Sequence, residues 1–400
     1  MISAEFVGPH VVENEKKIVM LIMDGLGGLP AKDGKTALEY AKTPNLDALA
    51  ADGAVGLIQP VGPGVAPGSG PAHFALFGYD PITTDIGRGA LAATGIGFDL
   101  KQGDVAARIN FCTVDENGAV TDRRAGRIAT ELNAKLCEKL GGISLEGVEL
   151  FVRPVKDHRA VVVFRGPGLE AEVCDTDPQD IGVPPHPVTA TEPGSERTAE
   201  LARAFLAQAA ERLKTEHPAN MILLRGFAPH PVLPSFEQAY KLKAAAIAVY
   251  PDYKGMARIC GMDIRETGTE EADEIATLEK DWNDFDFFYV HIKKTDSYGE
   301  DGNFDGKVHV IEVVDELMPR ITALKPDFLI VTGDHSTPAL YKAHSWHPVP
   351  VLTWGPWVRP DTATSFGERA CEAGALGLFP SSELMMMALG HTQKLVKYGA

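Results

Sequence analysis

The 400-residue sequence lacks a long apolar segment, an excess of positive charge and any closely spaced pair of cysteines. No stretch approaches the roughly 20 apolar residues that a membrane-spanning helix needs, so we expect no membrane association. The formal net charge is -17, from 38 Lys and Arg against 55 Asp and Glu. Nucleic acids and anionic membranes select for a basic surface, so neither is expected as a partner. A small anionic substrate stays compatible with this charge where metal ions or a few arginines reverse the field locally.

Cysteine is scarce, scattered and odd in number, which fits reduced thiols in a cytoplasmic protein. The amino terminus carries Glu5, Glu13 and Glu15, and its first apolar run, residues 18–23, stops at Asp24. That pattern is not the pattern of a signal peptide. Hydrophobic residues make up 44% of the chain and charged residues 23%, which is typical of a globular protein. Four hundred residues exceed what one core usually serves, so we expect two domains or one domain with an insertion.

The clearest feature present is a short apolar run that ends at two polar residues, Asp334 and His335. The run, residues 330–332, is typical of a buried strand of a parallel sheet. Ligands collect where such strands end. For an isolated pair of this kind, a turn with the imidazole on the surface is the commoner explanation, but companions elsewhere in the chain favour a site.

Three further polar residues stand in equivalent positions. Asp24 follows a predicted strand over residues 18–23, Asp296 follows another over residues 287–292, and His344 precedes an apolar run near the carboxyl terminus. Several carboxylates at one sheet edge raise each other's pKa values and cost stability unless cations neutralise them. Two divalent metal ions are the simplest explanation, because two-metal sites hold both oxygens of a phosphoryl displacement.

Two more residues complete this candidate site. Glu300 lies four positions after Asp296, a spacing that points both carboxylates the same way on one helical turn. Ser69 precedes a predicted helix over residues 71–77, and a helix amino terminus suits a phosphate or another anion. A metal-bound Ser69 would lose its proton readily and act as a nucleophile, giving a phosphoserine intermediate. Taken singly, Ser69 is slightly better explained as a helix cap, and each ligand at least equally well as a solvated surface group.

The alternation of predicted strands and helices indicates an α/β fold with an inserted α+β segment. We assign the metal-binding domain to residues 1–104 and 236–400, and the insertion to residues 105–235. Residues 86–103 contain five glycines and are predicted to be a loop-rich crossover that leads into the insertion.

Seven motifs match those of a known family. They are Met23-Asp24-Gly25, Pro67-Gly68-Ser69-Gly70-Pro71-Ala72-His73, Gly78-Tyr79-Asp80-Pro81, Gly87-Arg88-Gly89, Asp175-Thr176-Asp177-Pro178, Gly333-Asp334-His335-Ser336-Thr337-Pro338 and Ala343-His344-Ser345. With them the chain resembles the cofactor-independent phosphoglycerate mutases of the archaeal-type branch, within the alkaline phosphatase superfamily. The resemblance implies an alkaline-phosphatase-like three-layer sandwich with an inserted smaller α+β domain. It also implies interconversion of 3-phosphoglycerate and 2-phosphoglycerate through a phosphoserine.

The resemblance assigns each candidate residue a role, with Ser69 as the phosphorylated nucleophile. The implied ligands of the first metal are Asp24, Ser69, Asp334 and His335, and those of the second are Asp296, Glu300 and His344. The family more commonly has histidine at the position of Glu300. Glutamate is a harder ligand, so we expect two divalent ions that are manganese, with magnesium or zinc as alternatives.

The insertion is expected to bind the substrate. A mutase must hold glycerate and exclude water while the phosphate rests on the enzyme, and guanidinium groups match both the carboxylate and the phosphate. By similarity to the family, the candidate substrate-binding residues are Arg123, Arg124, Arg127, His158, Arg159, Arg225 and Lys254. For each one singly, a solvated surface charge is as good an explanation.

Three functions follow from these observations. The first is a cytoplasmic mutase with a small phosphorylated substrate, and the second is a metal-dependent phosphohydrolase or an enzyme of phosphonate metabolism. A panel of phosphate esters and phosphonates would separate these two. The third, a non-catalytic metal-binding protein, is disfavoured because Ser69 and six plausible ligands are all present. The sequence carries no prediction of oligomeric state.

Overall fold

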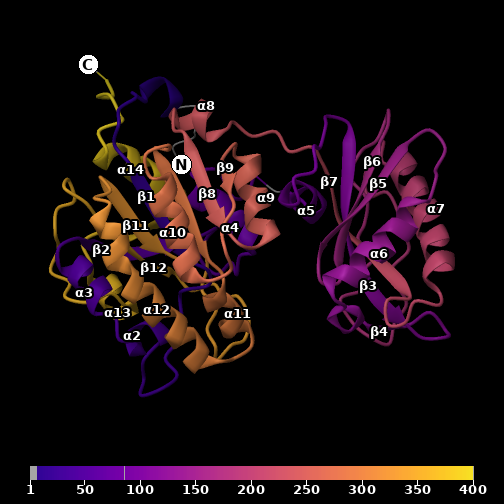
Figure 1. The fold of residues 1–400 in the computed structure, drawn as a ribbon, viewed down its shortest axis with the longest axis horizontal. Coiled ribbons are helices and arrows are strands. Elements are labelled where there is room, and N and C mark those ends of the chain that lie inside the picture. The colour runs from indigo at the N-terminus through magenta and orange to yellow at the C-terminus, as the bar shows by residue number, and fades with distance from the viewer. Residues whose placement is uncertain (1–6, 85, 400) are drawn as a thin grey trace. The chain divides into compact units, whose positions relative to one another are not determined.

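A computed structural model describes residues 7–84 and 86–399 (Figure 1). The chain divides into two compact units, one of Met1–Asp85, Pro234–Tyr253 and Cys260–Ala400, the other of Ile86–Leu233 and Lys254–Ile259. Glu5, on which part of the amino-terminal prediction rests, lies outside the described residues. Within the described ranges, no helix is both long and apolar enough to cross a membrane.

The first unit contains an eight-stranded sheet in the order β13-β2-β12-β11-β1-β10-β8-β9. The strands are β1 Ile18–Met23, β2 Ala54–Gln59, β8 Ala244–Ala248, β9 Asp263–Arg265, β10 Phe287–Ile292, β11 Phe328–Thr332, β12 Val349–Trp354 and β13 Gly377–Pro380. Of these eight strands only β12 runs antiparallel to β1. Every residue of β1, β10 and β11 is buried, which is expected of strands covered on both faces.

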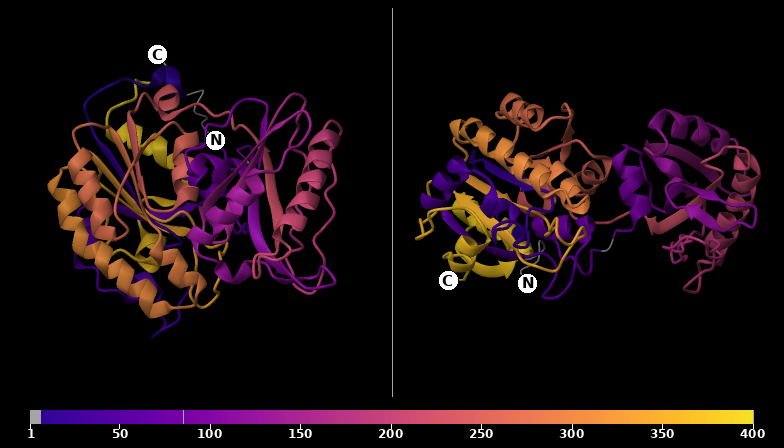
Figure 2. Two further views of the ribbon diagram at one scale, coloured as in Figure 1. Left: turned by 45° about the vertical axis from the view of Figure 1, so that its right-hand side comes forward. Right: turned by 90° about the horizontal axis from the view of Figure 1, so that it is seen from below.

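Helices cover both faces of this sheet. The helices of the unit are η1 Gly8–His10, α2 Ala37–Tyr40, α3 Pro44–Ala51, α4 Ser69–Leu76, α8 Phe236–Tyr240, α10 Glu271–Asp281, α11 Lys294–Glu300, α12 Phe304–Ala323, α13 Glu368–Ala373, η3 Ser381–Glu383 and α14 Leu384–His391. Helices α10 and α12 pack against each other, and the right-hand view of Figure 2 shows the orange α12 and the yellow α14 on opposite sides of the sheet. The predicted α/β fold is confirmed.

The strand order explains why distant residues can meet at one edge of the sheet. Strand β1 lies between β10 and β11, with Met23 opposite Ile292 and Ile22 opposite Thr332. Because the three strands are parallel, the residues that follow them emerge together. Strand β12 runs antiparallel to β11, so the segment that enters β12 begins at the same edge.

The second unit is an antiparallel sheet whose strand β3 pairs with β4, β6 and β7, while β5 pairs with β6. Its elements are α5 Arg88–Gly95, β3 Asp104–Val114, β4 Val120–Asp122, η2 Ala125–Arg127, α6 Thr130–Gly141, β5 Glu149–Lys156, β6 Arg159–Arg165, α7 Glu196–Leu213 and β7 Met221–Pro229. Along β3, Val105, Ala107, Ile109 and Phe111 pack in one core with residues of α6 and α7, whereas Ala106 packs with α5. The side chains alternate between two faces, as a strand requires.

The prediction that residues 86–103 form a loop-rich crossover is wrong, because Arg88–Gly95 form helix α5. Gly89 allows helix α5 to approach the sheet closely, since a Cβ added to this residue would lie 2.1 Å from the carbonyl oxygen of Ala106. The glycines, which suggested a loop in the sequence, allow this helix to pack closely against the sheet.

The limits of the second unit therefore differ from the predicted residues 105–235. The unit begins at Ile86, because α5 belongs to its core, and it also includes Lys254–Ile259. This last segment is part of α9, Pro251–Ile259. It joins the second unit because Gly255 packs against α5, where an added Cβ would lie 2.4 Å from the carbonyl oxygen of Leu91.

Candidate metal centre

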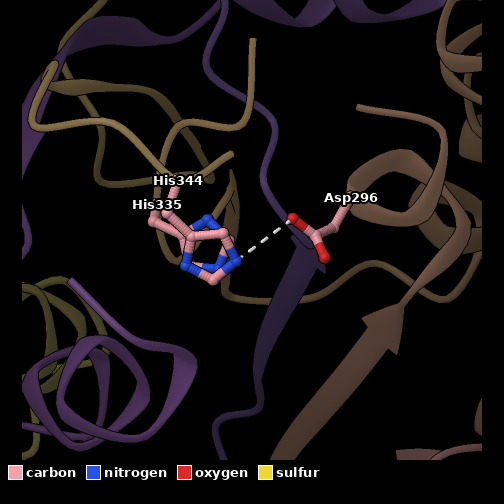
Figure 3. A group of neighbouring side chains, drawn as sticks. All are labelled: Asp296, His335 and His344. Atoms are coloured by element: carbon pink, nitrogen blue, oxygen red, sulfur yellow. Dashed lines mark ion pairs between the residues drawn. The ribbon is translucent and has the colours of Figure 1, made fainter. Parts of the chain in front are cut away.

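The structure brings predicted ligands together in two groups within the first unit. Ligand atoms of Asp24, Asp334 and His335 lie within 4.8 Å of one another, and those of Asp296, His335 and His344 form a second such group. In Figure 3 the two imidazoles overlap beside the carboxylate of Asp296. Their ring centroids are 3.6 Å apart. The two groups share His335 and form one centre.

The first group has buried carboxylate oxygens that no hydrogen bond satisfies. The Nε2 atom of His335 lies 3.1 Å from Oδ2 of Asp334 and 3.4 Å from Oδ1 of Asp24. All three side chains are buried, and neither Asp24 Oδ1 nor Asp334 Oδ2 accepts a hydrogen bond from any described residue. Buried acceptors without donors usually have a ligand or an ion as partner. Two carboxylates and one imidazole are a donor set that fits a divalent transition metal.

Electrostatics keep this group in the protonation state that binds metal. Burial raises the pKa of Asp24, but Lys293, His291 and His335 outweigh burial and hold it well below its ordinary value. Burial lowers the pKa of His335, against the attraction of Asp334 and Asp24. The carboxylate is therefore ionised and the imidazole neutral, which are the forms that ligate cations.

The second group is more open. The Nε2 atom of His344 lies 3.6 Å from Oδ1 of Asp296 and 3.8 Å from Oε1 of Glu300. The Glu300 side chain is 56% exposed and lies outside the compact group. Asp296 and Glu300 both belong to α11, which directly follows β10. The structure thus places all three predicted ligands near one another, with Glu300 at the rim.

Ser69 is the first residue of α4, and its hydroxyl faces the first group. The Oγ atom lies 3.4 Å from Nε2 of His335. The hydroxyl of Tyr253 donates a hydrogen bond of 3.5 Å to the same Oγ atom. The predicted nucleophile therefore lies beside a predicted metal ligand.

Sequence reasoning missed Lys293, which lies between the two groups. Its ammonium nitrogen is 2.9 Å from Oδ2 of Asp24, 2.5 Å from Oδ2 of Asp296 and 2.9 Å from the hydroxyl oxygen of Tyr253. It neutralises part of the negative charge that the carboxylates bring together. Lys293 immediately follows β10, so the same strand-end rule that selected the other residues could have found it.

Two buried histidines lie behind the ligands and were also missed. The Nδ1 atom of His73 is 3.2 Å from Oδ2 of Asp334 and 2.8 Å from the carbonyl oxygen of Ser69. The Nε2 atom of His291 is 3.2 Å from Oδ2 of Asp24. Contacts of this kind orient ligating carboxylates. The sequence offered two signals for His73: its place four residues after Ser69, on the same face of α4, and its presence in a family motif.

The predicted substrate-binding residues lie in the second unit, where His158 marks a strongly positive cluster. Burial and four neighbouring arginines, Arg159, Arg124, Arg127 and Arg108, lower the pKa of His158 to about 4. His158 is therefore neutral at physiological pH. The sequence did not single out Arg108, because it lies inside a strand that otherwise reads as core.

Two other predicted residues are partly neutralised within the same unit. Arg123 donates hydrogen bonds of 2.8 and 2.9 Å to the two carboxylate oxygens of Asp177. Arg225 lies 3.1 Å from Asp177 and stands opposite Arg108 in the pairing of β7 with β3. Lys254 belongs to the short segment of α9 that groups with this unit. Several arginines thus lie together around His158, and guanidinium groups suit an anionic ligand.

Comparison with known proteins extends these observations. A family model described as 2,3-bisphosphoglycerate-independent phosphoglycerate mutase matches residues 50–220. The probable 2,3-bisphosphoglycerate-independent phosphoglycerate mutase of Thermotoga neapolitana is 52% identical over 398 residues, which cover 99% of each chain. The protein of the same name from Aquifex aeolicus is 50% identical over 407 residues, which cover 99% of this chain and 100% of the relative.

Two solved structures are similar over nearly their full length. The PH0037 protein from Pyrococcus horikoshii is 30% identical, with a TM-score of 0.84 and coverage of 97% of this chain and 100% of that one. The cofactor-independent phosphoglycerate mutase from Thermoplasma acidophilum is 31% identical, with a TM-score of 0.72 and coverage of 94% and 100%. The likeness includes both units of the chain.

Proposed function

The chain belongs to the family of 2,3-bisphosphoglycerate-independent phosphoglycerate mutases, and we propose that it interconverts 3-phosphoglycerate and 2-phosphoglycerate through a phosphoserine at Ser69. The observation that carries this proposal is the position of the Ser69 hydroxyl, 3.4 Å from His335 in a group of buried carboxylates and imidazoles. The enzyme is accordingly an isomerase that moves a phosphoryl group between two hydroxyls of one molecule.

The chemistry assigned to Ser69 needs a proton to leave and a phosphoryl group to arrive. Divalent cations, when bound, would lower the pKa of the hydroxyl and offset charge on the phosphoryl oxygens. Ser69 Oγ forms the new bond to phosphorus as the ester bond to glycerate breaks, and the released glycerate oxygen takes up a proton. Return of the phosphoryl group to the other glycerate hydroxyl restores Ser69. Water is not consumed.

The surrounding residues have separate tasks in this scheme. Tyr253 donates a hydrogen bond to Ser69 and accepts one from Lys293, so the two side chains orient the hydroxyl. His73 and His291 hold the carboxylates of Asp334 and Asp24 in place.

Manganese is the proposed ion at both positions. The Nε2 atom of His335 lies 3.1 Å from Asp334 and 3.4 Å from Asp24, so we assign its one lone pair to the first ion. Asp296 and His344 then need another ligand, and Glu300 can supply a carboxylate oxygen. A hard oxygen ligand in place of imidazole favours manganese or magnesium over zinc.

The arginine cluster around His158 is proposed to bind the carboxylate or phosphate of the substrate. Its charge supports this role, because planar guanidinium groups pair with both anions. A cytoplasmic location is part of the proposal and agrees with the five free cysteines.

The experiment supplies metal-stripped protein with Mn²⁺ and 3-phosphoglycerate, without 2,3-bisphosphoglycerate, and follows the products by phosphorus NMR. We expect 2-phosphoglycerate to form, its formation to stop when a chelator is added, and its formation to resume when Mn²⁺ is restored. Release of inorganic phosphate alone would instead assign a phosphohydrolase. The control is the same assay with Ser69→Ala protein, which separates enzymatic transfer from contamination.

A further inference from the structure

Lys307, near the start of α12, has a fully buried ammonium group that faces main-chain carbonyls. Its Nζ atom donates hydrogen bonds of 2.7 Å to the carbonyl of Gly25, 3.1 Å to that of Gly27 and 2.9 Å to that of Thr337. An ammonium group has three N–H donors, so all of them are used by carbonyl oxygens. The acceptors come from two loops that are far apart in the sequence.

These two loops are the ones that follow β1 and β11. The backbone N–H of Thr337 donates hydrogen bonds of 3.1 Å each to the carbonyls of Gly25 and Gly27. The carbonyl oxygens of all three residues therefore converge on one point, where their partial negative charges repel one another. The positive charge of Lys307 offsets this repulsion and ties the loops to α12.

Both loops carry predicted metal ligands. Asp24 directly precedes Gly25, so its carboxylate moves with the first loop. In the second loop, the hydroxyl of Thr337 donates a 2.6 Å hydrogen bond to Oδ1 of Asp296 and lies 3.0 Å from Nδ1 of His335. A shift of the carbonyl cage would thus displace ligands of both groups.

Holding a charge here is unfavourable by itself. Burial lowers the pKa of Lys307 to about 8, despite the attraction of Glu368, Asp296 and Asp24. A methionine would fill nearly the same volume without this desolvation cost. The charge is therefore better explained by what it fixes than by packing alone.

We propose that Lys307 is a positioning residue of the metal centre: its ammonium group fixes the loop after Asp24 against the loop after His335 and so sets the spacing of the ligands. The inference rests on the proposed metal-dependent function. Loss of the charge should weaken metal binding beyond what a loss of stability explains.

The test compares Lys307→Met with Lys394→Met. Lys394 is a matched control, because it is also buried in the first unit and its ammonium group donates a 2.7 Å hydrogen bond to a main-chain carbonyl, that of Asn14. Free Mn²⁺ is followed by electron paramagnetic resonance during titration of each full-length protein, and Tm is measured in parallel. We expect both variants to have a lower Tm than the wild type. Only Lys307→Met should bind Mn²⁺ more weakly, by about 10-fold to 100-fold.

A second measurement uses Lys307→Ala, which lacks the last three carbons and the ammonium group of the side chain. Propylammonium matches the missing atoms, so it should restore Mn²⁺ affinity, whereas propanol should not. Restoration by propanol to the same extent would show that volume, and not charge, matters, and would overturn the proposal. If Lys307→Met does not fold, Lys307→Gln takes its place, with a weaker Mn²⁺ affinity as the required result.

The outcomes separate this inference from the function beneath it. Wild-type affinity for Mn²⁺ in Lys307→Met, or an equal loss in Lys394→Met, overturns the role of Lys307 while leaving the mutase assignment intact. A wild-type protein that binds no divalent ion would overturn the proposed function and this inference together.

Discussion

The Oγ atom of Ser69 lies 3.4 Å from the Nε2 atom of His335, although the two residues are 266 positions apart in the sequence. One begins helix α4 and the other follows strand β11, so only the folded sheet edge joins them. The proposed nucleophile therefore lies next to a proposed metal ligand, and removing its hydroxyl should separate metal binding from catalysis.

Replacing Ser69 by alanine should lower mutase activity by at least about 10³-fold, because the variant lacks the hydroxyl that is proposed to accept the phosphoryl group. Mn²⁺ binding should weaken far less, since the carboxylates and imidazoles remain. Mass spectrometry of acid-quenched protein should find a phosphoryl group on the wild-type enzyme and none on the variant. Ser235→Ala, which removes only the cap of α8, is the control and should keep full activity. A phosphoenzyme formed by Ser69→Ala would contradict the assigned nucleophile.

Replacing Glu300 by alanine should weaken Mn²⁺ binding at one of two sites by about tenfold, equivalent to about 1.4 kcal/mol. Glu300→His should favour zinc over manganese, because imidazole is the softer ligand. Titration of each ion by calorimetry measures both effects. Asp301→Ala removes the neighbouring carboxylate and should change neither affinity. Equal Mn²⁺ affinity in Glu300→Ala and Asp301→Ala would remove Glu300 from the ligand set.

Replacing Arg124 by alanine should raise KM for 3-phosphoglycerate about tenfold, because a charge-assisted contact to the substrate is lost. The pKa of His158 should also rise from about 4, since Arg124 is one of the charges that lower it. Steady-state kinetics and NMR titration measure the two effects. Arg212→Ala serves as control, because Arg212 bonds only to carbonyls of Lys139 and Gly142 in the same unit. If both variants keep the wild-type KM, Arg124 does not bind the substrate.

Glu274 on α10 gives a prediction about stability and pH. Burial, followed by repulsion from Glu271, raises the pKa of Glu274 from 4.5 to about 9. Between these values the folded state keeps a proton that the unfolded state has lost, so the free energy of unfolding falls as pH rises. Glu274→Gln removes this pH dependence. Its free energy of unfolding, relative to that of the wild type, should rise by up to about 1.4 kcal/mol for each pH unit between the two pKa values.

Urea unfolding at a series of pH values from 5 to 9 measures the difference in unfolding free energy between Glu274→Gln and the wild type. Glu316→Gln, which changes an exposed position on α12, is the control. A constant difference between Glu274→Gln and wild type across this range would show that Glu274 ionises normally.

Much of the centre could be predicted because its residues follow strands. Buried strands of a parallel sheet are readable as short apolar runs, and the polar residue after each one lies at a known edge. This reasoning found Asp24, Asp296, Asp334 and His335, which the structure brings together. It failed at α5, because glycines that serve close packing against β3 look like loop residues in a sequence.

The sequence by itself determined the α/β class, the family motifs and the residues at the strand ends, because these depend on local periodicity and on chemistry within a few positions. Only the tertiary structure decided that Lys293, Tyr253 and Lys307 belong to the same centre. Their contacts join segments up to 282 positions apart and exist because β1 lies between β10 and β11. The residues around Lys307 in the sequence do not predict which carbonyls its ammonium group contacts, because the order of the strands in the sheet places those carbonyls beside it.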